Sequence, residues 1–446
     1  MTANPAYPPR LGHGAELLGE FKDSGYTRPP SLIRRADGEV IQLSRLLYLV
    51  ARLMDGNRNP ADIADLASGE LGRSLSPGQV CYLIVAKMAP LGILAGAGTA
   101  APSPASPLLA LRARGTLLTA RGATAAGTFL RPLFHWPVVA AVIVSVAAAD
   151  CWLFAGRGLG EAFGQVLNNP VNRLLVAALS LVSAAFHECG HAAGCRYGGA
   201  RPGRIGVGIY LVWPSFFTNV TDSYRLGRAG RLRTDLGGLY FNLIFILVLT
   251  AVYGETSAPL LVLVVAVTHL EMLQQLLPFA RFDGYFILSD LIGVPDLFGR
   301  VMPVLRSTFA GGRPDPRVTG LRPRARAVIT GWVVCVVPLL TLTLGYLVLH
   351  FPAASRALGQ SAAHAARLTI AAVAGHHYAA AAADMVGAAL AAVSMAGSLF
   401  VMAGLLRRAV TLSARWSAGR PRRRLLTVLA GAACAAALLC YWVTSG

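Results

Sequence analysis

The stretch FHECGH, residues 186–191, lies near the end of a long apolar run over residues 172–195 and contains the pattern H-E-x-x-H. Residues four apart lie on one face of a helix, so the imidazoles of His187 and His191 can bind one metal ion with the Glu188 carboxylate beside them. A catalytic zinc ion needs such a pair of neutral imidazoles, a third protein ligand and an open position for water. The motif therefore predicts a helix that carries the site of a zinc hydrolase.

Two histidines on one helix face can also be packing residues or helix-end residues. The two histidines by themselves do not decide between this alternative and a metal site. The acidic residue between them favours a site, because a charged side chain inside an apolar run is unfavourable unless it serves a function. We therefore predict that Glu188 is the general base that takes the proton of the attacking water.

The composition is typical of an α-helical multi-pass membrane protein. Hydrophobic residues make up 55% of the 446 residues and charged residues 14%, and the mean hydropathy is +0.55. These values exclude an ordinary soluble domain. About seven apolar runs, each close to the roughly 20 residues that a bilayer requires, predict transmembrane helices. The runs cover residues 137–155, 172–195, 236–253, 259–280, 328–350, 385–406 and 425–443.

The net charge of +19 comes largely from arginines that gather in alternate loops between these runs. The loops after the second, fourth and sixth runs are rich in arginine, and the first 20 residues contain no apolar signal core. The positive-inside rule then predicts a cell-membrane protein with its N-terminus and its H-E-x-x-H motif towards the cytoplasm. This distribution also makes nucleic acid the less favoured explanation of the charge.

A third metal ligand is available at the same depth. The fourth apolar run travels inward like the second, and Asp283 follows it directly. Sets of two histidines and one carboxylate are common in catalytic zinc sites. We predict that His187, His191 and Asp283 bind Zn²⁺. A solvated carboxylate at the start of a loop is the other explanation of Asp283.

The N-terminal part predicts a small cytoplasmic α+β domain of the winged-helix type. Two short β-rich segments flank Asp37-Gly38, which is a hairpin signal. Three helices with Ser or Asn at their N-terminal caps are expected to follow. They are predicted over residues 45–54, 61–72 and 78–89.

The two metal-site segments resemble the motifs of the site-2 protease family of intramembrane zinc proteases. In that family H-E-x-x-H is followed at a distance by N-L-L-P-x-x-x-L-D-G, whose Asp completes the zinc site. Residues 275–284 read QLLPFARFDG, with Gln275 in place of Asn and Phe282 in place of Leu. The resemblance implies a zinc-dependent endopeptidase that hydrolyses a peptide bond in or near the membrane.

A further family element, G-P-x-x-N, corresponds to GLYFN at residues 238–242, with Leu239 in place of Pro. We predict that Asn242 donates a hydrogen bond to the substrate backbone or to the developing oxyanion, where no bulk water is available. An interhelical hydrogen bond is the alternative. Residues 204–214 contain β-branched and aromatic residues interrupted by glycines, which favours a strand. This segment resembles the family's membrane-associated hairpin. An irregular loop is the alternative.

The N-terminal domain resembles PqqD-like peptide-recognition elements over residues 43–56, LSRLLYLVARLMDG. This resemblance implies capture of a leader peptide as an added strand. DNA binding is less favoured, because the third predicted helix offers only Lys87 as a basic residue. Residues 285–297 resemble peptide zinc metalloproteases associated with ribosomally made, modified peptides.

Together these features predict five segments and a small set of partners. The expected partners are a precursor peptide and the lipid bilayer but no nucleic acid, with a second copy or biosynthetic proteins left open. A non-catalytic peptide-binding membrane protein, such as an immunity or export component, is the alternative function. The segments are a flexible N-terminus (1–24), a PqqD-like domain (25–95), a linker and pre-membrane segment (96–135), a metalloprotease core (136–300) and C-terminal transmembrane helices (301–446).

Overall fold

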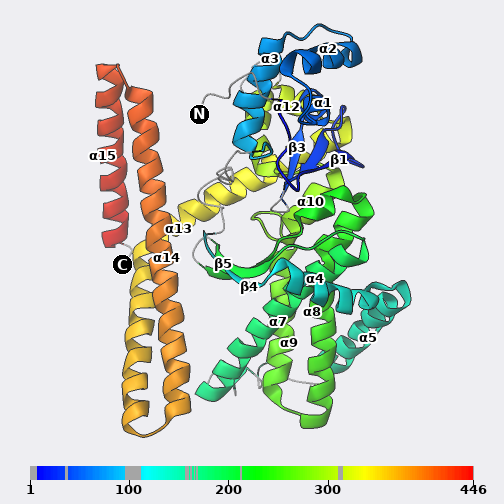
Figure 1. Cartoon of the computed structure of the whole chain (residues 1–446). Coiled ribbons are helices and arrows are strands. Elements are labelled where there is room, and N and C mark those ends of the chain that lie inside the picture. Colours follow the sequence, from blue (N-terminus) through cyan, green and yellow to red (C-terminus); the bar gives the residue numbers. More distant parts are fainter. Residues whose placement is uncertain are drawn as a thin grey trace.

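The computed structural model describes residues 8–35, 39–95, 112–155, 160, 163–164, 166, 169–210, 213–309 and 315–444. A small domain of strands and short helices lies at one end of the molecule, and long helices extend away from it (Figure 1). The mostly helical fold with a small N-terminal sheet domain agrees with the predicted fold class.

The N-terminal domain contains an antiparallel sheet and three helices around one apolar core. The sheet order is β1-β2-β3. Ser44, Asn59 and Ser76 cap the three helices through their side chains, as predicted. The elements are β1 (Glu16–Glu20), β2 (Ser31–Arg34), β3 (Val40–Leu43), α1 (Arg45–Leu53), α2 (Pro60–Leu71) and α3 (Pro77–Tyr82), which continues as a π-helix over Leu83–Met88.

This domain begins before the predicted boundary at residue 25. Strand β1 pairs with β2, and Arg10 and Leu11 form bridges with Asp55 and Leu94. The expectation of a flexible segment over residues 1–24 is therefore revised for residues 10–20. The segment ELLGE was not recognised as a strand because it is short and contains Gly19, which adopts a positive φ of 88°. The predicted turn at Asp37-Gly38 lies outside the described residues.

Residues 23–27 form a strap that fastens this domain to the rest of the chain. The amide of Gly25 donates to the Gly293 carbonyl at 2.9 Å, and the amide of Thr27 donates to the Gly320 carbonyl at 2.9 Å. A Cβ on Gly25 would lie 2.2 Å from the Ile292 carbonyl oxygen, so only glycine fits there. The strap therefore joins the predicted N-terminal domain (25–95) to the predicted core (136–300) and to the C-terminal segment (301–446).

Six helices in the described part of the chain are long and apolar enough to cross a membrane. The predicted run over residues 259–280 forms a shorter apolar helix, α9 (Pro259–Gln275). The chain is thus consistent with a multi-pass membrane protein, and the number of about seven crossings stays a prediction. The six helices are α5 (Trp136–Ala155), α7 (Pro170–Tyr197), α8 (Arg228–Thr256), α13 (Pro323–Ala374), α14 (Tyr378–Ser417) and α15 (Pro421–Thr444).

Helix α13 is much longer than the apolar run that predicted it. It contains 52 residues, including Pro338 and Pro352, and forms a hairpin with α14 (Figure 1). The alanine-rich sequence after residue 350 extends the helix, because alanine has the highest helix propensity.

A second sheet lies at one end of α7 and α8, on the side of the N-terminal domain (Figure 1). Strands β4 (Arg112–Leu118), β5 (Ile205–Tyr210) and β6 (Trp213–Thr218) are antiparallel in the order β4-β5-β6. The strand expected over residues 204–214 is present. Residues 112–134 are also ordered, because β4 pairs with β5 and is followed by α4 (Ala120–Leu130). These elements belong to the predicted linker and pre-membrane segment (96–135), of which residues 96–111 lie outside the described residues.

Helices α7 and α8 cross in contact at small residues. A Cβ on Gly190 would lie 2.2 Å from the Gly237 carbonyl oxygen, and a Cβ on Gly237 would lie 2.5 Å from the Gly190 carbonyl oxygen. A Cβ on Gly238 would lie 2.3 Å from the His187 Nε2 atom. The close crossing therefore depends on glycine and brings the α8 backbone against the motif imidazole.

This crossing generates the first prediction. The Gly190→Ala variant should be destabilised by about 1–3 kcal/mol, because the new methyl group forces the two backbones apart. Gly254→Ala is the matched control on α8, where a Cβ meets no atom within 4 Å and gains up to about 1 kcal/mol of helix propensity. Thermal unfolding in detergent measures both changes. Equal melting temperatures for the two variants would show that the crossing is not tight.

Candidate metal centre

The two motif histidines lie together near the cytoplasm-directed end predicted for α7. Asn169 caps this helix by accepting from the amides of Val171 and Asn172. Both imidazoles are buried, and the Nε2 atoms of His187 and His191 are 3.0 Å apart. The spacing of four residues therefore places both imidazoles on one face of the helix, as helix geometry predicts.

The chain returns to this point after α9. Asp283 begins helix α10 (Asp283–Ile292), and its Oδ2 atom lies 3.0 Å from His187 Nε2, while its Oδ1 atom lies 3.5 Å from His191 Nε2. The turn is tight, because a Cβ on Gly284 would lie 2.0 Å from the Leu276 carbonyl oxygen. The structure thus brings together the three side chains predicted to bind metal.

A helix from the C-terminal segment supports the turn that carries Asp283. The Trp332 indole of α13 donates to the Pro278 carbonyl at 2.8 Å. The same indole packs at its edge against the rings of Tyr285 and Phe298. The segment after residue 300, for which no role was predicted, therefore contributes to the position of the third candidate ligand.

The three side chains fit a zinc ion. Their ligand atoms all lie within 4.8 Å of one another, and among the described residues they form the group of His, Cys, Asp or Glu that can hold a metal. In a tetrahedral site with Zn–N bonds near 2.05 Å, neighbouring ligand atoms stand about 3.3 Å apart. Asp283 Oδ2 is buried and, apart from the His187 imidazole 3.0 Å away, has no hydrogen-bond partner among the described residues, as expected for an atom that a cation would satisfy.

The hydrogen bonds and charges around the cluster suit metal binding. His191 Nδ1 lies 2.8 Å from the Thr234 carbonyl oxygen. A carbonyl can only accept, so Nδ1 carries a proton, and Nε2 is the His191 atom that faces Asp283 and would bind a metal ion. Burial raises the pKa of Asp283, but the neighbouring imidazoles lower it further, so this pKa lies below its usual value. The carboxyl group is therefore an anion.

Glu188 is buried next to the edge of the second sheet. The hydroxyl of Thr218, the last residue of β6, donates to Glu188 Oε2 at 2.7 Å. The same hydroxyl oxygen lies 3.0 Å from the Glu188 backbone carbonyl oxygen. Thr218 was not identified from the sequence, because no local pattern shows that the end of a strand meets a helix 30 residues earlier.

These groups face one cavity of about 420 Å³. His187, Glu188, His191 and Asp283 form one part of its wall. Strand β6, the following loop and helix α10 supply much of the rest. The further lining residues include Ser215, Phe216, Phe217, Thr218, Thr221, Ser223, Tyr224, Asp235, Gln275, Arg281 and Asp290.

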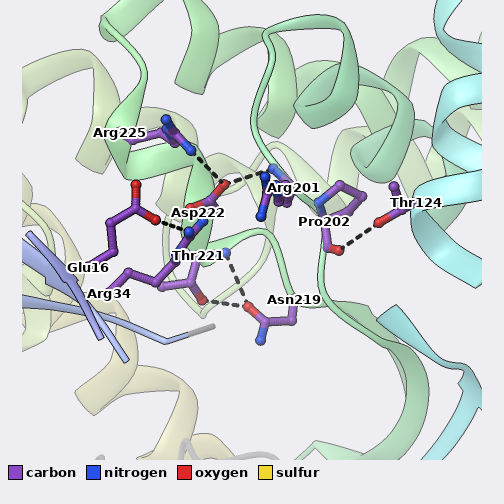
Figure 2. Close-up of polar contacts among 9 residues, drawn as sticks. All are labelled: Glu16, Arg34, Thr124, Arg201, Pro202, Asn219, Thr221, Asp222 and Arg225. Atoms are coloured by element: carbon purple, nitrogen blue, oxygen red, sulfur yellow. Dashed lines mark hydrogen bonds and ion pairs between the residues drawn. The ribbon is translucent and has the colours of Figure 1, made fainter. Parts of the chain in front are cut away.

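The loop that lines the cavity is fixed by a buried carboxylate, which Figure 2 shows. Asp222 is 4% exposed; it accepts from the Arg201 amide at 2.8 Å and from Arg34 Nη1 at 3.0 Å. Arg225 lies 3.8 Å from the same carboxylate, and Arg34 also pairs with Glu16. Since Arg34 belongs to β2, the N-terminal domain takes part in holding the cavity wall.

Asn242 differs from the other predicted site residues in its placement. It is 2% exposed on α8, and its Oδ1 atom has no hydrogen-bond partner among the described residues. It is not among the described residues that line the cavity, whereas Gln275 is. The buried position of Asn242 agrees with both alternatives derived from the sequence, so its role stays a prediction.

Comparison with curated proteins gives one relevant likeness. The chain is similar to the "Putative peptide zinc metalloprotease protein YydH" of Bacillus subtilis (strain 168), with 25% identity over 125 residues. The similar region covers 28% of this chain and 50% of that protein, so the chain spans about half the length of this relative. No family model matches, and no solved structure matches. The likeness supports a zinc metalloprotease at the level of the family.

The geometry generates a metal-binding prediction. The purified protein should bind one Zn²⁺ per chain, and Asp283→Ala should weaken binding by roughly a hundredfold or more, because it removes an anionic ligand. Asp65→Ala, at an exposed carboxylate on α2, should leave the affinity unchanged. Titration with a chromophoric chelator measures both. Wild-type affinity in the Asp283 variant would exclude that residue as a ligand.

Proposed function

We propose that the protein is a zinc-dependent endopeptidase that hydrolyses a peptide bond in or near the membrane. The observation that carries this proposal is the meeting of His187, His191 and Asp283 in one cavity with Glu188. The likeness to a protein named as a peptide zinc metalloprotease supports the same reaction class. The proposed substrate is a ribosomally made precursor peptide that is captured through its leader.

Residues of the chain have separate roles in the proposed hydrolysis. A bound zinc ion would supply a Lewis acid and lower the pKa of the attacking water. Glu188 takes the proton of this water and later gives it to the leaving amine. Thr218 donates to Oε2 of this carboxylate, so the other oxygen, Oε1, is proposed to accept the water proton. Thr234 fixes the His191 tautomer that a metal ligand needs.

The substrate chain is proposed to bind along β6. This strand pairs with β5 and is the last strand of its sheet, and its residues from Ser215 to Thr218 line the cavity. An added strand would place main-chain groups of the substrate next to Glu188 and hold the peptide in the extended form that hydrolysis requires. Asn242 is proposed to donate to the substrate backbone, and Gln275 offers a second amide on the cavity wall.

The N-terminal domain is proposed to hold the leader near this cavity. Strand β3 is the last strand of its sheet and can accept an added strand. The domain is fastened to the core by the Arg34–Asp222 ion pair and by Asp23 Oδ2, which accepts from the Arg228 amide at 2.9 Å. Capture of the leader would therefore raise the local concentration of the scissile segment.

The proposed location is the cell membrane, with the N-terminus and the cavity towards the cytoplasm. The six long apolar helices support a location in the membrane, and the arginine-rich alternate loops support the proposed orientation. The bilayer and the precursor peptide are the proposed partners. A second copy of the chain or biosynthetic proteins could join them.

Replacing the proposed base tests the function. Glu188→Gln should lower cleavage of a mixed peptide library by at least about a thousandfold, because the amide cannot accept the water proton, while zinc content stays at the wild-type value. Glu255→Gln, at an exposed site on α8, should cleave like the wild type. Mass spectrometry of the products measures cleavage in lipid nanodiscs.

The same experiment separates the enzyme from a non-catalytic peptide-binding protein. Equal product formation by wild type and Glu188→Gln would refute the assignment of the base. Zinc binding with no cleavage of any library member, or of a precursor with its leader, would favour the non-catalytic alternative.

A further inference from the structure

We propose that the cavity contains a subsite for a cationic side chain, lysine or arginine, of the substrate peptide, with Asp235 as its anionic partner. This inference rests on the proposed function, since it specifies the class of peptide that the cavity accepts. It comes from a carboxylate that the hydrolytic step does not use.

Asp235 lines the same cavity as the metal-site residues. It is on α8, next to Thr234, and only 7% of its surface is exposed. It lines the cavity, and its Oδ2 atom has no hydrogen-bond partner among the described residues. A buried acceptor without a partner is unfavourable, so this oxygen indicates a missing donor.

The nearest buried cation is committed to another carboxylate. Arg231 is fully buried, and its Nε atom donates to Asp290 Oδ1 at 3.0 Å. Its Nη1 atom donates to the carbonyl oxygens of Leu226 at 2.9 Å and Lys22 at 3.2 Å. Arg231 Nη2 has no hydrogen-bond partner, so the guanidinium does not bond Asp235 in this structure.

Arg281, which lines the cavity, is also engaged. Arg281 Nη2 donates to Asp296 Oδ1 at 3.2 Å. Asp235 and Asp290 lie within hydrogen-bond reach of each other, and of these two the Arg231 guanidinium bonds only Asp290. A buried charge in this situation requires either a proton or a cationic partner.

The shape of the site favours an organic cation over a second metal. Asp235 and Asp290 offer two carboxylates, and among the described residues no third His, Cys, Asp or Glu joins them in a metal-holding group. A lysine ammonium or arginine guanidinium needs one anion and a few neutral acceptors. Thr221, Ser223 and Tyr224, whose side chains carry hydroxyl groups, also line the cavity.

A substrate peptide that pairs with β6 can place a lysine or arginine side chain next to Asp235. In a peptide paired with β6, alternate side chains point to the same face of the sheet. A residue on the cavity side would reach Asp235 while the neighbouring peptide bond lies at Glu188 and the metal ligands. The subsite therefore selects a basic residue close to the scissile bond.

The experiment uses pairs of fluorescent peptide hydroxamates, which bind zinc, in nanodiscs that hold the zinc-loaded full-length protein. The two members of a pair differ at one position, lysine against norleucine, and this position is moved along both sides of the hydroxamate. At one position lysine should bind about ten- to hundredfold more tightly, as expected for a charge-assisted hydrogen bond. In Asp235→Asn this preference should fall to within about twofold.

Asp384→Asn is the matched control, because Asp384 is also 7% exposed but pairs with Arg173 at 2.9 Å, away from the cavity. It should keep the preference for lysine. Equal binding of lysine and norleucine peptides to the wild type at every position would overturn the subsite, and this comparison needs no variant to fold. A shared proton between Asp235 and Asp290 would produce that result. Retained lysine preference in Asp235→Asn would overturn the assignment of the residue.

A zinc-independent measurement separates this inference from the proposed function. The metal-free protein should be stabilised against heat by n-butylammonium, a lysine side-chain mimic, and Asp235→Asn should not. Stabilisation without any hydroxamate binding would mean that the cation subsite exists and the zinc peptidase does not. Absence of stabilisation together with tight, unselective hydroxamate binding would leave the peptidase and reject the subsite.

Discussion

The contact between the backbones of α7 and α8 is the constraint on which the site depends. Gly190 and Gly237 leave no room for a Cβ between the two helices, and Gly238 admits the His187 imidazole. The same approach lets His191 reach the Thr234 carbonyl of α8. In a bilayer, where lipid tails compete equally for apolar side chains, small residues that allow close packing are a principal source of helix association. The cluster is thus fixed by backbone shape before any ion binds.

Two buried charged side chains, Asp222 and Arg231, connect the N-terminal domain to the helices and the loop around the cavity. Asp222 joins β2, the Arg201 amide and the loop on the cavity wall, and Arg231 joins α8, α10 and the backbone of Lys22. Each of these groups would be strongly unfavourable if one partner were removed. The N-terminal domain is therefore held in a defined position beside the cavity. Asp235 and Asp290 both line the cavity, and of these two only Asp290 bonds a guanidinium among the described residues.

The sequence allowed the helices and the metal cluster to be predicted because both follow from short-range rules. A four-residue spacing places His187 and His191 together, and the direction of two apolar runs brings Asp283 to their depth. Thr218 and Asp235 could not be predicted, because their significance depends on packing between segments that are distant in sequence. Strand β1 was missed since its five residues include a glycine. The support of Asp283 by Trp332 crosses the boundary predicted at residue 300, up to which the family resemblance extends.

The strap over residues 23–27 has a consequence for how such a protein can evolve. Interchangeable domains usually meet at exposed linkers that few contacts cross. Here Gly25 fits against Ile292 without space for any side chain, Thr27 bonds Gly320, and the Arg322 amide donates to Gly25. A different N-terminal domain acquired by recombination would have to fit the backbone around Ile292 and Gly320. The N-terminal domain and the rest of the chain are therefore expected to be inherited as one unit.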